Sequence, residues 1–195
     1  MAETEKEITV KLKLNLDETK LFFVNKGIPL VESFVLKDTY MIKEDVDVSK
    51  TPNLDLLSQA LMLRECIGNE HTKALIYKDK TYDKKGNILN SIKYSCPLVD
   101  IDKTYDLLKA IKYKECFRYE QECLCYANDK YNVLIEYIPD LGLFAELENN
   151  NKSIEELISE LNELNIPYYE NDYFVKKASL MLNEIKKRRW NNGRE

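Results

Sequence analysis

The sequence predicts an α+β protein in which about eight antiparallel strands curl into a closed or nearly closed β-barrel with helices packed outside it. Strand-like segments with alternating polar and apolar residues recur from residue 7 to residue 148. Two helical segments interrupt them, and two further helices follow at the C-terminal end. About eight strands with so few helices among them indicate an antiparallel sheet that curls or closes.

The first half of the chain contains the following elements. A helix is expected over residues 16–26, with Asn15 or Asp17 as its cap and Gly27 at its C-terminal end. A strand over residues 31–40 comes next. Further strands fit residues 60–67, 73–80 and 88–99, with a turn at 84–87.

The second half repeats this order in a weak form. A helix is expected over residues 102–111. Strands follow over residues 115–120, 120–127, 131–138 and 144–148. Ser153 and Glu156 form a predicted capping box that starts a helix over residues 153–164. Pro167 separates it from a last helix over residues 172–189.

Composition limits the class of protein. The 195 residues include 44% hydrophobic residues, which is enough for a core, and one domain over 1–195 is expected. The barrel would span about residues 5–148 and the C-terminal helices about 153–189. The net charge of −5 argues against general nucleic-acid binding.

The sequence also predicts a cytoplasmic protein without a membrane partner. It has no run of about 18 apolar residues, and its acidic start lacks the apolar core of a secretory signal. The five cysteines are odd in number and fit no zinc spacing, so reduced thiols are expected. A single histidine, His71, disfavours a histidine-based nucleophilic mechanism.

Single charged residues stand on the predicted strands and could share one face of the sheet. Glu146 and Glu148 lie roughly 7 Å apart by strand geometry, a spacing at which carboxylates can hold Mg²⁺ or Mn²⁺. If the sheet closes with its charges inward, acids and bases from five strands meet in a polar lumen. These residues are Glu7, Lys11, Arg64, Lys78, Glu136, Glu146 and Glu148. Taken singly, each strand fits equally well a half-buried strand with its charges in water.

These segments resemble those of the CYTH superfamily, the triphosphate tunnel proteins. Residues 7–11 stand in the place of the opening Glu-x-Glu-x-Lys motif, and residues 144–148 resemble the Phe-x-Glu-x-Glu strand. Three further segments resemble the Asp-Thr-Tyr motif, the Leu-Arg-x-Arg strand and the strand with a phosphate-binding lysine. They are residues 38–40, 61–64 and 75–78. The resemblance covers roughly residues 5–185, and its most specific part is residues 141–148.

The resemblance implies an eight-stranded antiparallel tunnel that binds a small-molecule triphosphate, or another polyanion, together with Mg²⁺ or Mn²⁺. The residues that it assigns to phosphate are Lys11, Arg64 and Lys78. The residues that it assigns to the metal are Glu7, Glu136, Glu146 and Glu148. Lys13 and Lys93 are added as phosphate-binding candidates that could restore positive charge.

The chain departs from the family pattern at several positions. Thr9 replaces the second acid of the opening motif, and Met62 and Ser91 stand where arginine is usual. Gln121 and Cys123 replace the basic residues of a late strand. Each lost charge-assisted contact is worth on the order of 1.5–3 kcal/mol, so together these changes weaken the binding of a shared ligand.

Several functions stay open on this evidence. The first is a divalent-metal-dependent enzyme that hydrolyses the terminal phosphate of an organic or inorganic triphosphate. A class IV-type adenylyl cyclase ranks below it, because no contacts to a base and sugar are identified. The second is a catalytically impaired module that binds a phosphorylated metabolite or another anion, and the third is a structural barrel whose inner charges pair with one another. A homodimer is compatible with the sequence.

Overall fold

The computed structural model describes residues 2–4, 6–82, 88–170 and 172–192. Its described strands form one antiparallel sheet in the order β1-β6-β5-β4-β3-β7-β8-β9-β2. The strands are β1 Ala2–Thr4, β2 Glu7–Lys11, β3 Leu30–Lys43, β4 Leu61–Ile67, β5 His71–Tyr82, β6 Ile88–Pro97, β7 Tyr113–Ala127, β8 Asn132–Ile138 and β9 Gly142–Glu148. The turn predicted at residues 84–87 lies outside the described residues.

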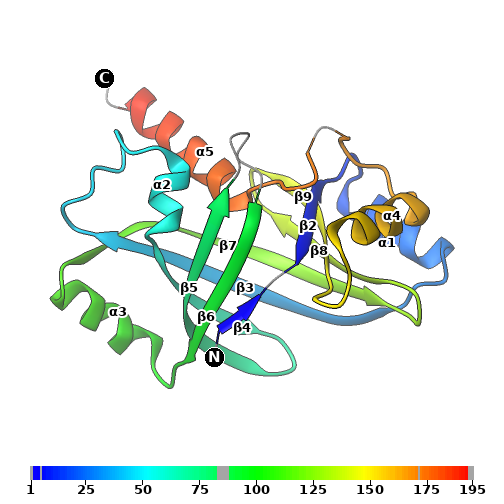
Figure 1. Ribbon diagram of the computed structural model, residues 1–195, viewed down its shortest axis with the longest axis horizontal. Coiled ribbons are helices and arrows are strands. Elements are labelled where there is room, and N and C mark those ends of the chain that lie inside the picture. The colour runs from blue at the N-terminus through cyan, green and yellow to red at the C-terminus, as the bar shows by residue number, and fades with distance from the viewer. Residues whose placement is uncertain (1, 5, 83–87, 171, 193–195) are drawn as a thin grey trace.

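The N-terminal segment links the two edges of this sheet. β1 pairs with β6 at one edge, and β2 pairs with β9 at the other. Because β1 and β2 follow one another in the chain, the strands curl strongly around a common interior (Figure 1). This confirms the predicted closed or nearly closed antiparallel barrel. β2 lies in the strand predicted to begin at residue 7, whereas β1 was not predicted.

The longest strands, β3 and β7, pair with each other along nearly their whole length. The sequence pattern divided β7 into two strands at residue 120, and that boundary is wrong. Polar and apolar surroundings alternate without a break through this point, because Gln121 and Cys123 are buried while Glu120 and Glu122 are exposed. The continuous alternation keeps one face of β7 toward the interior of the barrel.

The described helices are α1 Leu16–Asn25, α2 Asn53–Ser58, α3 Ile101–Ala110, α4 Ile154–Leu164 and α5 Lys177–Asn192. α1 and α4 cover the outer face of the curl. Ile8 and Val10 of β2 pack there in one cluster with Phe23 of α1 and Leu161 of α4. Both helices begin with a capping box, and the one at Ser153 is the one predicted. The helices outside the sheet therefore agree with the predicted fold class.

α2 and α5 pack on one another at one end of the barrel. Phe144, on the inner face of β9, is fully buried in a cluster with Leu56 of α2 and Leu182 of α5. α2 was not predicted, because its six residues are too few for a periodic pattern to be recognised. No helix in the described part of the chain is long and apolar enough to cross a bilayer.

α5 starts five residues later than the predicted boundary at residue 172. The preceding residues run along β2 instead: the Thr9 amide donates to the Tyr173 carbonyl at 2.9 Å, and the Val175 amide donates to the Thr9 carbonyl at 3.0 Å. These hydrogen bonds satisfy backbone groups of β2 that β9 does not reach. The extended segment also carries the start of α5 to the interior of the barrel.

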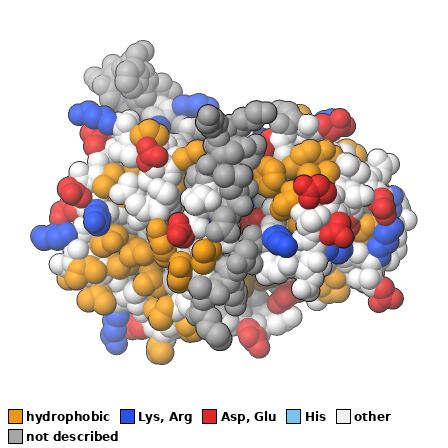
Figure 2. Space-filling model, in the orientation of Figure 1, with side chains coloured by type: hydrophobic (Ala, Val, Ile, Leu, Met, Phe, Trp, Pro, Cys, Tyr) orange, Lys and Arg blue, Asp and Glu red, His pale blue; other side chains and the backbone are white. Residues whose placement is uncertain are grey.

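α3 lies apart from the other helices and leaves apolar side chains in solvent. Leu108 packs under the sheet with Met41 and Leu63, whereas Leu107 and Ile111 are more than half exposed. Figure 2 shows hydrophobic side chains gathered over this part of the surface.

Candidate functional site in the barrel interior

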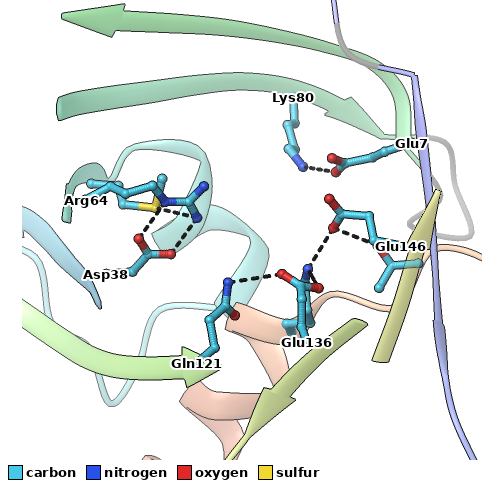
Figure 3. A network of polar contacts seen from close by, with 10 residues as sticks. Glu7, Asp38, Arg64, Lys80, Gln121, Glu136 and Glu146 are labelled. Atoms are coloured by element: carbon cyan, nitrogen blue, oxygen red, sulfur yellow. Dashed lines mark hydrogen bonds and ion pairs between the residues drawn. The ribbon is translucent and has the colours of Figure 1, made fainter. Parts of the chain in front are cut away.

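A cavity of about 180 Å³ lies inside the curl and is lined by residues from seven strands and from the start of α5. The structure brings five of the predicted site residues to its wall: Glu7, Arg64, Lys78, Glu136 and Glu146. Figure 3 shows how several of these side chains point toward one another from separate strands. The charged faces that the sequence left ambiguous therefore do meet in a common interior.

Three acids converge at the edge of this cavity. β2 and β9 pair so that Glu7 lies opposite Glu148 and Thr9 lies opposite Glu146. One carboxylate oxygen from each of Glu7, Glu146 and Glu148 lies within 4.8 Å of the others. Glu7 and Glu146 are partly buried and Glu148 is exposed, so the cluster opens toward solvent. Such an all-oxygen donor set fits a hard divalent cation such as Mg²⁺ or Mn²⁺.

Glu7 is held in its ionised form. Burial raises the pKa of this carboxyl, but the nearby charges of Lys78, Lys80 and Lys177 together lower it to about 2. The Lys80 ammonium also donates to Glu7 Oε1 at 3.3 Å. A carboxylate with so low a pKa needs to release no proton when it binds a cation near neutral pH.

Glu136 is not a member of this three-acid cluster but lies next to Glu146. The Gln121 side-chain amide donates to its Oε1 at 3.0 Å, and the Lys177 ammonium donates to its Oε2. Lys177 also donates to Glu146 Oε2 at 2.7 Å and thus links the two acids. Burial and the negative charge of Glu146 raise the pKa of Glu136 to about 7, although the positive charges of Lys177 and Arg64 act to lower it. Glu136 and Glu146 raise the pKa of Lys177 against the effect of burial.

Arg64 makes a two-pronged ion pair inside the barrel. Its Nε and Nη2 atoms donate to the two carboxylate oxygens of Asp38 at 2.7 and 2.6 Å. Asp38 is 1% exposed, so the pair is largely shielded from water. A phosphate that binds Arg64 would therefore use the remaining hydrogens of Nη1 and Nη2 or displace Asp38.

The predicted lysines occupy different places. Lys78 lines the cavity, and Lys93 lies opposite Lys78 in the β5–β6 pair, hence on the same face of the sheet, without lining the cavity. Lys11 shares the inner face of β2 with Glu7 but lies beyond the cavity wall, opposite Phe144. Lys13 follows the end of β2, is exposed, and places its ammonium over the Tyr169 ring at 5.6 Å.

Other residues of the site were not predicted as ligand-binding groups. Lys80 follows Lys78 at the strand period of two, a signal that could have identified it. Lys177 had no such signal, because its position depends on the packing of α5. The inner end of the cavity is apolar and aromatic, where Tyr40 and Tyr119 stack at 6.2 Å between ring centroids. This end can exclude water from a bound ligand.

Comparison with known proteins finds no matching family model and no matching curated protein. Solved structures do match. The PH1819 protein from Pyrococcus horikoshii is 22% identical, with a TM-score of 0.68, over 92% of this chain and 99% of the other. A candidate adenylate cyclase from Vibrio parahaemolyticus is 16% identical, with a TM-score of 0.67, over 94% and 99% of the two chains. The chain has the CYTH fold.

A third match is a candidate adenylyl cyclase from Hippeastrum, HpAC1, described as having a dominant triphosphatase activity. It is 12% identical, with a TM-score of 0.59, over 92% of this chain and 95% of the other. Identities this low establish the CYTH fold alone, because one fold can carry several activities. The function of this CYTH-fold chain has to be inferred from the residues inside its barrel.

The raised pKa of Glu136 predicts a pH dependence of stability. With a pKa of about 7 in the folded chain against an ordinary 4.5, the folded chain keeps a proton that the unfolded chain releases between these values. The free energy of unfolding contributed by this group therefore falls as the pH rises through that window. Glu136→Gln lacks the titrating group. From about pH 4.5 to about pH 7.5, we expect wild-type stability to fall by on the order of 2 kcal/mol relative to Glu136→Gln in urea denaturation. A stability difference between the wild type and Glu136→Gln that stays constant over this pH range would contradict the prediction.

Proposed function

We propose that the CYTH tunnel of this chain binds a small triphosphate together with Mg²⁺ or Mn²⁺ and hydrolyses its terminal phosphate. The observation that carries this proposal is the convergence of Glu7, Glu146 and Glu148 at the edge of a cavity that Lys78 and Lys80 also line. Carboxylates for a divalent cation and ammonium groups for phosphate oxygens are the two donor types that phosphoryl transfer needs.

Each group has a distinct task in this proposal. Glu7, Glu146 and Glu148 hold the cation, which when bound acts as a Lewis acid on the phosphoryl oxygens. Lys78 and Lys80 neutralise the phosphate chain, and Lys80 exchanges its contact with Glu7 for one with phosphate. The apolar inner end keeps bulk water away, which strengthens these charge interactions.

The size of the cavity favours a small substrate over a nucleotide. Its volume of about 180 Å³ lies below the range of roughly 300–1,000 Å³ typical of sites that enclose drug-sized ligands. A cyclase has to hold a base and a ribose as well as three phosphates. Hydrolysis of a compact triphosphate therefore ranks above adenylyl cyclase activity.

A second candidate function is a tunnel that binds a phosphorylated metabolite or another anion without turnover. It is favoured by the internal pairing of Arg64 with Asp38 and of Lys177 with Glu136 and Glu146. These pairs reduce the positive charge that a triphosphate would meet. Binding would then remain, but with fewer groups aimed at the transferring phosphate.

Measurement of phosphate release separates the two functions. Tripolyphosphate, thiamine triphosphate and ATP would each be supplied with Mg²⁺, with Mn²⁺ and with a chelator. The enzyme proposal predicts metal-dependent release that is fastest from tripolyphosphate, because it is the smallest of the three compounds. A rise in melting temperature on adding the triphosphate, without release, supports the binding module. If there is no phosphate release and no rise in melting temperature, both functions are contradicted.

A further inference from the structure

Lys177 is the first residue of α5 and lies between two acids of the barrel wall. Glu136 belongs to β8 and Glu146 to β9, and the register of these strands makes the two residues diagonal neighbours on one face. The side chain of Lys177 is 15% exposed, and those of Glu136 and Glu146 are 3% and 16% exposed. A cation between two carboxylates so close together and so poorly hydrated stabilises their ionised forms.

The position of this lysine in its helix is electrostatically unfavourable by itself. The N-terminal end of a helix carries partial positive charge, so a lysine in the first turn is repelled by it. The contacts of Lys177 with the two carboxylates offset this repulsion. α5 is also fixed in place, because Met181 and Leu182 are buried and the Asn53 side chain donates to the Ser179 carbonyl at 3.0 Å.

Lys177 belongs to a hydrogen-bonded network that also contains Glu136, Glu146, Thr9 and Gln121. Glu146 Oε2 accepts from Lys177 at 2.7 Å and from the Thr9 hydroxyl at 3.4 Å. Gln121 is 2% exposed, and its Oε1 accepts no hydrogen bond from the described residues. Carboxylate, hydroxyl and amide oxygens of this kind could hold a hard cation if the ammonium were removed.

We propose that Lys177 is a built-in cation that takes the place of a second divalent ion between Glu136 and Glu146. The tunnel then binds one divalent ion, at Glu7, Glu146 and Glu148, and the C-terminal helix supplies the other positive charge. The single divalent ion at the three acids rests on the proposed function. The role of Lys177 does not, because it concerns the Glu136–Glu146 pair alone.

The test is the stoichiometry of Mn²⁺ binding, measured by titration calorimetry and by the loss of the free-Mn²⁺ electron paramagnetic resonance signal. Lys177→Met removes the charge and keeps much of the length of the side chain. Lys176→Met is the matched control, because Lys176 also lines the cavity but donates to the Phe174 carbonyl. We expect one Mn²⁺ for the wild type and for Lys176→Met, and two for Lys177→Met. Adding Glu136→Gln to Lys177→Met should abolish the additional site.

The outcomes separate this inference from the proposed function. No Mn²⁺ for the wild type but one for Lys177→Met, lost again when Glu136→Gln is added, would contradict the three-acid metal site and support the role of Lys177. Equal stoichiometry in the wild type and Lys177→Met, or two ions in the wild type, would overturn the inference. If Lys177→Met folds poorly, Mn²⁺ should raise its melting temperature more than it raises that of Lys177→Met/Glu136→Gln. Equal shifts would overturn the inference.

Discussion

Glu146→Gln is expected to lower metal-dependent phosphate release by about 100-fold or more. Glu146 is the acid on which the site depends most, because it belongs to the three-acid cluster and also accepts hydrogen bonds from Lys177 and Thr9. The amide keeps the shape of the side chain but offers a neutral oxygen to the cation. Its NH₂ group would also face the Lys177 ammonium if the amide took the opposite orientation.

The measurement compares initial rates of phosphate release from tripolyphosphate at saturating Mn²⁺, with melting temperatures as a check of folding. Glu122→Gln is the control, because Glu122 is exposed on the outer face of β7 and lies opposite Tyr137 in the β7–β8 pair. That variant should retain the wild-type rate. A folded Glu146→Gln variant with at least half the wild-type rate would exclude Glu146 from the metal site.

Arg64→Met is expected to lower the free energy of unfolding by about 3–5 kcal/mol. The substitution removes the cation but leaves Asp38, at 1% exposure, without the partner for both of its carboxylate oxygens. An uncompensated buried charge is far more costly than a lost surface pair. The expected loss is a large part of the stability of an ordinary domain.

Urea denaturation provides the measurement, with Lys37→Met as its control. Lys37 also pairs with an acid on a neighbouring strand, Glu120, but their side chains are 48% and 58% exposed. This exposed pair should contribute less than about 1 kcal/mol. Adding Asp38→Asn to Arg64→Met should recover part of the loss, since the amide carries no charge. An Arg64→Met variant that loses less than about 1 kcal/mol would show that Asp38 is compensated in another way.

The sequence predicted the barrel and much of its lining because strand alternation determines which face each side chain takes. Glu7, Lys78 and Glu146 were placed inward on this basis, and they do line the cavity. Alternation says nothing of which charges become partners once the strands curl. Asp38 lies 26 residues before Arg64, and their pairing follows from the register of β3 with β4.

Lys177 could not be predicted for a related reason. Its place in the barrel depends on residues 173–175 running along β2 as an extended segment, which delays the start of α5. The apolar periodicity of this region fits a helix from residue 172, so local sequence favoured the wrong boundary. The hydrogen bonds with Thr9 are long-range contacts, and they override that local preference.

The most direct test of the account is to locate a cation and a triphosphate in crystals grown with Mn²⁺ and a non-hydrolysable triphosphate analogue. Anomalous scattering identifies Mn²⁺ independently of the protein density. The account predicts a Mn²⁺ peak among Glu7, Glu146 and Glu148, with the phosphates extending into the barrel toward Lys78. An analogue bound only on the outer surface, or a Mn²⁺ peak distant from all three acids, would contradict it.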